Sequence, residues 1–454
     1  MRQKTEEMKQ KMKEEYAKKV DEYFLQIDEM KENGNFSIND IEKLLGDGIS
    51  AAKEVLTAIT EDIIRPELDT GPNAGSKKKP CPTCGKALNL WDKGRKITIM
   101  TIHGPLTFRR PYWYCRKCKY GVCPDDSAYG INDSDHRMTR SVKLEAVYFA
   151  QNQLSFDRAA EVIKRVYKID VNRETIREIS EEIGTKVFKH DESEAEQMLT
   201  NIHNIEADEK KAGVVYIMTD GATVNTRIKD ENGSTWRENK TVIAFSNKDL
   251  IKRKDEGNII VHKEIAPLIG TSEDFKKFAL RTAVAAGYGK YNETVIVGDG
   301  ASWIRNMSNE IFPDAIQILD LYHLKENVYK FAKHVLNDSA EVVKWAETVI
   351  DKIENHYAVD EALAMIPFIE KLPDNIPNLR TYIENNRSKI DYPTFREQGY
   401  FVGSGAVESI QKTIVHQRLK RAGMRWGVDG AQALLTLRAK DESKRWDDVE
   451  ALVA

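Results

Sequence analysis

Three acidic residues far apart in the chain have the surroundings that a catalytic metal site needs. Asp220 closes an apolar run at 214–218, and Asp299 closes another at 295–297. Glu408 follows the sequence Gly-Ser-Gly at the start of a basic segment. An acid that ends a strand beside glycine stands at the rim of a sheet, where a phosphate can approach the backbone closely. We therefore predict that these three acids hold Mg²⁺ or Mn²⁺ for two-metal phosphoryl transfer.

An acid and a histidine follow the next expected strand. Asp320 and His323 are three residues apart, so they share one side of the helix that begins there. We predict that they form an accessory pair close to the metal ions or to the scissile phosphate. The alternative is a helix cap beside a histidine that only packs.

The segment after Glu408 is basic and has the pattern of a helix. A basic helix beside a carboxylate site can hold DNA phosphates. The residues expected to do so are Lys412, Arg418, Lys420, Arg421 and Arg425. Trp426 could stack on an unpaired base, and a tryptophan packed in the core is the alternative.

Four of the five cysteines form two Cys-x-x-Cys pairs, Cys81 with Cys84 and Cys115 with Cys118. Each pair turns two thiolates towards one point, which suits tetrahedral Zn²⁺. Alternating strands are expected at 96–101 and 106–114 between the pairs. We therefore predict a zinc ribbon over residues 76–125, with a redox pair of dithiols as the alternative.

Positive charge is concentrated in the same region. Between Lys77 and Lys119 the chain has twelve lysines and arginines but one acid, Asp92. Such clustering is typical of surfaces that bind phosphates. We expect the ribbon to contact DNA, although a solvated basic surface would have the same composition.

Residues 126–205 are expected to form a helical DNA-binding region, with helical periodicity from about Arg137 to His190. One amphipathic helix begins near Ser155 and a second begins at Arg173, with a short polar connection between them. Two short helices joined in this way are typical of a helix-turn-helix, whose second helix enters the major groove. Arg173 and Arg177 would then contact DNA, although an ordinary helical hairpin fits the pattern too.

The remaining segments complete the expected organisation. Residues 1–75 are expected to be helical, with a flexible linker at 71–76. Strands are expected at 213–219, 222–229, 240–246, 258–265, 294–298 and 315–319. Antiparallel strands followed by strand, helix and strand are the order of an RNase H-like fold. We therefore predict an α/β RNase H-like core at 206–335, a helical insertion at 336–398 and a catalytic helix region at 399–454.

Composition sets broader limits. With 454 residues and 41% apolar content, the chain is long enough for two to four domains with sizeable cores. The net charge of −3 gives no global attraction for nucleic acid. Without an apolar signal segment or a run of membrane-spanning length, the sequence predicts a cytoplasmic protein without membrane association.

Several of these motifs resemble those of a known enzyme family. Residues 298–304, 319–324, 403–409, 418–426, 430–434 and 437–439 resemble bacterial insertion-sequence DDE transposases of the ISKra group. The paired cysteines resemble the zinc ribbon of that group and of the related ISLre-type transposases. The resemblance extends from about Cys81 to Trp446.

The resemblance implies roles for the acids already singled out. Asp220, Asp299 and Glu408 would be the catalytic triad, and Asp320 with His323 would match an accessory motif. Asp220 is preferred as the first acid over two neighbours. Asp208 follows no apolar strand, and Asp230 sits at an expected hairpin.

The activity implied is that of a DNA transposase that cuts the ends of its element and joins them to target DNA. Water would cut a strand to leave a 3′ hydroxyl, which would then attack target DNA in a second in-line transfer. Because two ends must be brought together, a homodimer or a larger assembly is expected. The alternative is a non-catalytic zinc-ribbon DNA-binding regulator derived from a transposase. A haloacid-type phosphatase is disfavoured, because Met218 stands where that pattern has a further aspartate.

Overall fold

The computed structural model describes residues 2–32, 37–70, 80–124, 126, 131, 136–205, 207, 209–253 and 257–453. The expected linker at 71–76 and Asp208 lie outside these residues. The chain divides into two compact units, of which unit 1 comprises residues 1–149 and 156–179, and unit 2 comprises residues 150–155 and 180–454.

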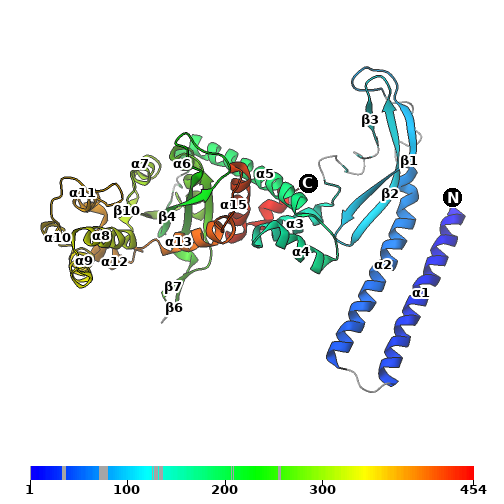
Figure 1. Ribbon diagram of the computed structural model, residues 1–454, viewed down its shortest axis with the longest axis horizontal. Coiled ribbons are helices and arrows are strands. Elements are labelled where there is room, and N and C mark those ends of the chain that lie inside the picture. Colours follow the sequence, from blue (N-terminus) through cyan, green and yellow to red (C-terminus); the bar gives the residue numbers. More distant parts are fainter. Residues whose placement is uncertain are drawn as a thin grey trace. The chain divides into compact units, whose positions relative to one another are not determined.

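Long helices and an antiparallel sheet make up most of unit 1 (Figure 1). Helix α1 (Arg2–Glu32) packs beside helix α2 (Ile38–Thr70). Helix α2 begins after Ser37, whose hydroxyl accepts a hydrogen bond from the backbone of Asp40 at 3.3 Å. Strands β1 (Asn89–Thr101), β2 (Gly104–Cys115) and β3 (Tyr120–Val122) form a sheet in the order β1-β2-β3.

Three helices follow the small sheet along the chain. They are α3 (Arg140–Asn152), α4 (Phe156–Tyr167) and α5 (Arg173–Thr200). The expectation of a short helix after Arg173 is wrong, because α5 is 28 residues long. Apolar residues at helical spacing continue past Ile179 through Ile183 and Val187, and all three are buried.

A five-stranded mixed sheet forms the centre of unit 2. Its order is β10-β9-β4-β5-β8, and a separate two-stranded sheet pairs β6 with β7. The strands are β4 (Lys211–Asn225), β5 (Trp236–Ser246), β6 (Leu250–Arg253), β7 (Gly257–Ile260), β8 (Glu264–Ile269), β9 (Tyr291–Gly298) and β10 (Ile316–Leu319). Strands β9 and β10 run parallel to β4, whereas β5 runs antiparallel to both of its neighbours. The α/β class expected from the sequence is therefore confirmed.

Two strand boundaries differ from the expectation. The segments 213–219 and 222–229 were expected as two strands, but β4 runs through Gly221 because β5 pairs with it continuously from Val215 to Asn225. The segment 258–265 was expected as one strand, but β7 ends at Ile260 and β8 begins at Glu264. Pairing with β5 keeps Gly221 in an extended conformation within β4. The segment 258–265 is divided because β7 pairs with β6, whereas β8 belongs to the large sheet.

Helices cover both faces of the large sheet (Figure 1). The residues of β4 alternate, so Val215 and Ile217 pack with α6 (Ser272–Ala286) and α7 (Ser302–Ile311) in one core. On the other face Tyr216 lies against Phe401, with ring centroids 4.9 Å apart. Helix α13 (Gly405–Gln411) packs on β4 and β5.

Further helices lie between β10 and α13. They are α8 (Leu321–Val335), α9 (Ser339–Glu354), α10 (Val359–Met365), α11 (Leu379–Asn385) and α12 (Tyr392–Glu397). After α13 the chain continues through a π-helical turn at Lys412–His416 and α14 (Gln417–Leu419) to α15 (Val428–Glu442) and α16 (Trp446–Leu452). No helix among the described residues combines the length and the apolar character that crossing a membrane requires.

Helix α15 protects the edge of the large sheet. The Gln432 side chain accepts a hydrogen bond from the Ile269 amide at 2.8 Å and donates one to the Pro267 carbonyl at 3.1 Å. These bonds satisfy backbone groups of the edge strand β8 that would otherwise be open to another chain.

The approach of α5 to α15 depends on Gly184. A Cβ atom there would lie 2.5 Å from the carbonyl oxygen of Ala433. We expect Gly184→Ala to lower the free energy of unfolding by about 1–3 kcal/mol, because backbone must move. Gly46→Ala in α2 is the control, since nothing lies within 4 Å of that position. It should stabilise by up to about 1 kcal/mol. Equal urea midpoints for Gly184→Ala and wild type would contradict this account of the packing.

Candidate functional site

Two of the acids are brought together by parallel strands in register. Strand β4 pairs with β9 as far as Met218 opposite Val297. Asp220 and Asp299 each lie two residues further along the chain, so they emerge side by side at the same edge. Asp220 does not end its strand, as the sequence suggested, because β5 continues opposite it. Asp220 lies beyond the point where β4 stops pairing with β9 but within the stretch that still pairs with β5.

The turn that carries Asp299 is fixed by glycine. Gly300 has a φ of +84°, and a Cβ atom there would lie 2.7 Å from the Leu319 side chain. The amide of Ala301 donates to Oδ1 of Asp299 at 2.8 Å. From α11, the hydroxyl of Tyr382 donates to the Asp299 carbonyl at 3.0 Å. The helical segment before α13 therefore holds the end of β9 in place.

The third acid is attached to the first through helix α13. Glu408 lies on this helix, and Gln411 follows one turn later. The Gln411 side chain donates to the backbone carbonyl of Asp220 at 3.0 Å. This bond fixes the helix against β4 at the residue that carries the first acid. Sequence reasoning missed Gln411, because a glutamine on an apolar helix face has no signature of its own.

Asp320 is a buried centre of hydrogen bonding. Its Oδ1 accepts from the amides of Tyr322 and Ser404, both at 3.1 Å. Its Oδ2 accepts from the Ser404 hydroxyl at 2.7 Å and from Nδ1 of His323 at 2.5 Å. Asp320 thus caps α8 and also holds the residue that precedes α13. The Ser404 contact spans 84 positions of sequence and could not be read from the chain.

These contacts set the charges of the accessory pair. Burial raises the pKa of Asp320, but the hydrogen bonds from His323 and Ser404 outweigh it and hold that pKa below its usual value. The hydrogen bond to Asp320 raises the pKa of His323 to about 9 against the effect of burial. The charges of Asp299 and Asp220 contribute further to that rise. Without a bound cation, His323 is therefore an imidazolium ion at neutral pH.

The acidic residues form one continuous cluster around His323. Potential metal-ligand atoms of Asp320, His323 and Glu408 (two carboxylate oxygens and a ring nitrogen) all lie within 4.8 Å of one another. The charges of Asp299 and Asp220 also act on His323, so all five residues singled out in the sequence are brought near this histidine. Of the three acids predicted to hold the cation, however, Glu408 alone belongs to this group among the described residues.

The cluster carries carboxylate oxygens, the ligand type that hard divalent cations prefer. Oδ1 of Asp220 accepts a hydrogen bond from the Gly221 amide at 2.8 Å, and Oδ1 of Asp299 accepts one from the Ala301 amide at 2.8 Å. Among the described residues, no hydrogen bond reaches Oδ2 of either acid. Burial raises the pKa of Asp220, and the charges of Asp299 and Glu408 add to the rise. A hard cation between these oxygens would relieve the repulsion.

Other acids lie in different settings. Asp230 sits at the β4–β5 hairpin and pairs with Arg237 at 3.1 Å, so it is not part of the cluster. Donor atoms of His190, Asp191 and Glu194 also lie close together. Asp191, however, is paired with Arg281 at 2.7 Å and Lys440 at 2.9 Å, which satisfies its charge within the protein.

The basic residues after Glu408 differ in their exposure to solvent. Lys412, Lys420, Arg421 and Arg425 are exposed. The expectation that Arg418 contacts DNA is contradicted, because its side chain is 1% exposed and donates to the Ala150 carbonyl at 3.1 Å. Trp426 is also buried, and its indole donates to the Leu419 carbonyl. The core alternative for Trp426 is therefore correct.

The arginines of the expected helix-turn-helix are engaged with acids of unit 1. Arg173 lies 3.5 Å from both Asp157 and Glu174. Arg177 pairs with Glu174 at 3.0 Å and with Glu178 at 3.7 Å. These partners reduce the positive charge of this surface, and contact with DNA through Arg173 and Arg177 stays a prediction.

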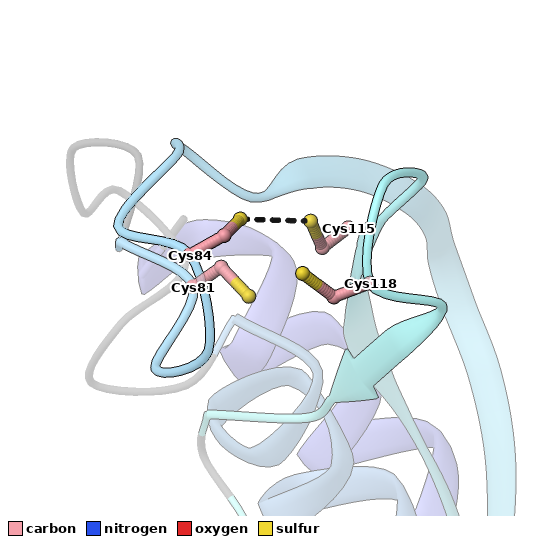
Figure 2. A group of neighbouring side chains, drawn as sticks. All are labelled: Cys81, Cys84, Cys115 and Cys118. Atoms are coloured by element: carbon pink, nitrogen blue, oxygen red, sulfur yellow. Dashed lines mark hydrogen bonds between the residues drawn. The ribbon is translucent and has the colours of Figure 1, made fainter.

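The four paired cysteines converge at one end of the small sheet (Figure 2). Their Sγ atoms all lie within 4.8 Å of one another, and those of Cys84 and Cys115 are 3.7 Å apart. Tetrahedral zinc with Zn–S bonds of about 2.3 Å would separate its sulfurs by about 3.8 Å. The cluster therefore has the dimensions of a zinc site.

Both cysteine pairs have the same local backbone. Gly85 follows Cys84 with a φ of 70°, and Lys119 follows Cys118 with a φ of 53°. Backbone amides of Thr83 and Cys84 lower the pKa of the buried Cys81 thiol to about 6 against the effect of burial. The Cys84 thiol and burial raise the pKa of Cys118 to about 12. A cation at the centre would remove the repulsion that opposes full ionisation.

Metal analysis tests the cysteine cluster. We expect about one zinc per chain in the wild-type protein, and its loss in the double variant Cys84→Ser, Cys118→Ser. Cys123→Ser is the matched control, because Cys123 lies outside the cluster, and it should keep the metal. Zinc retained by the double variant, or a metal-free wild type, would exclude the site.

The charge of His323 can be measured directly by NMR titration of its ring in protein freed of divalent cations. We expect the wild-type ring to lose its proton as the pH rises through about 9. In Asp320→Asn the ring should lose it at lower pH, because burial then acts without the partner carboxylate. Asp314→Asn, at an exposed acid, is the control. Identical titration in wild type and Asp320→Asn would contradict the pairing.

Comparison with known proteins places the chain in a family. The model of the uncharacterised protein family UPF0236 matches residues 88–451, which are 364 of the 454 residues. The matched span includes the acidic cluster and the second cysteine pair, and it begins after the first pair. No curated protein matches the chain. Because the match covers about four fifths of its length, the chain belongs to the UPF0236 family.

Proposed function

We propose that this protein is a DNA transposase, which cuts the ends of a mobile element and joins them to target DNA by metal-dependent phosphoryl transfer. The observation that carries the proposal is the convergence of Asp220, Asp299 and Glu408 from separate elements around the charged His323. Phosphoryl transfer needs positioned oxygen donors and cations rather than a covalent nucleophile from the protein. The association of UPF0236 with transposase-like proteins agrees with this chemistry.

The order of the strands supports an RNase H-like catalytic core. Strand β4 is central, with the antiparallel β5 and β8 on one side and the parallel β9 and β10 on the other. This is the arrangement expected when three antiparallel strands are followed by two parallel ones. In it, the first and fourth strands supply two acids, and the helix after the insertion supplies the third.

The residues of the cluster would have distinct roles. Mg²⁺ or Mn²⁺ held by Asp220, Asp299 and Glu408 would activate the attacking oxygen and stabilise the leaving one. Asp320 engages Nδ1 of His323, which leaves the other ring nitrogen as a charged donor towards a phosphate. Water would be the nucleophile in cleavage, and the resulting 3′ hydroxyl would be the nucleophile in strand transfer. The protein itself forms no covalent bond.

Contacts with DNA would come from basic surfaces in both units. The exposed residues Lys412, Lys420, Arg421 and Arg425 follow the Glu408 helix and can neutralise phosphates near the site. The zinc ribbon and the helical region would recognise the ends of the element. Two ends must meet for joining, so a homodimer or larger assembly is the expected active form. The ISKra-type motifs named above are consistent with this arrangement.

The other candidate is a DNA-binding regulator that no longer cleaves. It is favoured by the basic cysteine ribbon, which could bind DNA without any catalytic acid. The presence of all three acids in one charged cluster favours the enzyme instead.

Strand cleavage on DNA that flanks the gene would test the proposal. With Mg²⁺ present we expect cleavage by the wild-type protein and a loss of about 10³-fold in Asp299→Asn, since a metal ligand contributes several kcal/mol. The exposed Asp314→Asn is the matched control and should cleave normally. Binding without cleavage by the wild type would favour the regulator, and equal cleavage by wild type and Asp299→Asn would refute the assigned site.

A further inference from the structure

We propose that the small sheet of unit 1 binds single-stranded DNA, with an unpaired base stacked on Trp91. The residues concerned form a continuous series of rings and guanidinium groups along β1 and β2. We call it the aromatic ladder, and its members in spatial order are Arg116, Trp91, Tyr114, Tyr112 and Arg95.

The ladder is built by close contacts between neighbours. The Arg116 guanidinium lies 5.5 Å from the centre of the Trp91 ring, and the Trp91 and Tyr114 ring centres are 5.3 Å apart. Tyr112 follows at 6.4 Å from Tyr114, and Arg95 lies 4.1 Å from the centre of the Tyr112 ring. The ring pairs are tilted, at 56° and 31°, and a row of rings with a cation at each end gives a surface that attracts both bases and phosphates.

Strand alternation separates this face from the zinc core. Trp113 packs with the cysteine cluster, so Tyr112 and Tyr114 on either side of it point the other way. Tyr112 lies across Gly121 of β3, where a Cβ atom would overlap its hydroxyl at 1.8 Å. The ladder is thus held in place by the ribbon and does not contribute to its apolar centre.

A β-bulge presents Trp91 to solvent. Leu90 is opposite Trp113 and Asp92 is opposite Tyr112, so Trp91 is the extra residue between adjacent partners. Bulges redirect side chains and often occur at functional sites. Trp91 is 58% exposed, an unusual state for so large an aromatic ring.

The surrounding charge selects a polyanion. Residues 80–124 contain nine lysines and arginines and a single acid, Asp92. Asp92 already accepts a hydrogen bond from the Gly94 amide at 2.8 Å. The exposed cations nearest in sequence to Trp91 and Arg116 are Lys93, Lys117 and Lys119. An acidic peptide could neutralise these cations but would leave the exposed ring without a partner.

The ring spacing indicates how a base would bind. A base sandwiched between two rings needs them about 7 Å apart, twice the stacking rise of about 3.4 Å. The ladder rings are closer than this, at 5.3 and 6.4 Å, so they admit no base between them. The base would therefore stack on the Arg116 side of the exposed Trp91 ring, where the exposed guanidinium can move aside. Only an unpaired base can present its face in that way. The choice of DNA rather than RNA rests on the proposed function.

Binding of fluorescein-labelled oligonucleotides to the full-length protein tests the ladder. The probes are a 20-nucleotide oligo(dT), its duplex with oligo(dA) and oligo(U) of the same length, without added divalent cation. We expect Trp91→Leu to weaken oligo(dT) binding at least about fivefold, and Trp91→Phe to retain most of it, because a phenyl ring still stacks on a base and an aliphatic side chain does not. Phe368→Ala, at an exposed ring of unit 2, is the control and should bind as the wild type does.

Three results would overturn the proposal. The first is equal oligo(dT) affinity in Trp91→Leu and Trp91→Phe when both retain zinc. The second is a loss of duplex affinity in Trp91→Leu as large as its loss of oligo(dT) affinity. The third is a loss of affinity in Trp91→Leu for oligo(U) but not for oligo(dT). If Trp91→Leu loses its zinc, Arg116→Ala is the variant to use in its place. Arg116→Ala should weaken oligo(dT) binding, and unchanged binding by that variant would also overturn the proposal. Since no cleavage is measured, failure of the proposed catalytic activity would leave this result unaffected.

Discussion

The hydrogen bonding of Asp320 is the interaction on which the rest of the site depends. One fully buried carboxylate accepts bonds from Tyr322, His323 and Ser404, and the last of these uses both its amide and its hydroxyl. A buried charge is tolerated only when its lone pairs are satisfied in this way. Through these bonds a single side chain starts α8, keeps His323 charged and fixes the entry to the helix that carries Glu408. Loss of the His323 partner would leave a buried charge without a counterion, and loss of another donor would leave a buried lone pair unsatisfied, so these features are coupled.

Around this centre, each acid is held by a different physical device. Asp220 is placed by the register of β4 against β9 and by the bond from Gln411 to its carbonyl. Asp299 is placed by the glycine turn and by Tyr382. Glu408 is placed by a short helix fixed at its start through Ser404 and at its end through Gln411. The helices between β10 and α13 therefore support the site, since they supply Tyr382 beside the end of β9.

The two units divide the chemistry between them. Unit 2 concentrates negative charge around one imidazolium ion, as the proposed cation-dependent reaction on a phosphate would require. Unit 1 concentrates positive charge and an exposed tryptophan on a sheet that has four cysteines clustered at one end and a small apolar cluster around Phe108 elsewhere. A sheet this small buries little apolar surface, and a metal centre can compensate for that deficit. The opposite charges of the two units almost cancel, which explains why the net charge of −3 conceals both.

The sequence by itself determined the chemical identities, because acids at strand ends, paired cysteines and basic runs are local patterns. It also determined most elements, since periodicity and glycine turns act over a few residues. Only the tertiary structure decided what lies between distant segments: the Ser404 and Gln411 contacts, the interior position of Arg418 and the continuation of β4 past Gly221. An arginine reads as basic surface wherever it stands in a sequence. Its burial depends on carbonyl partners such as that of Ala150, 268 positions away, and such a pairing exists only once the chain has folded.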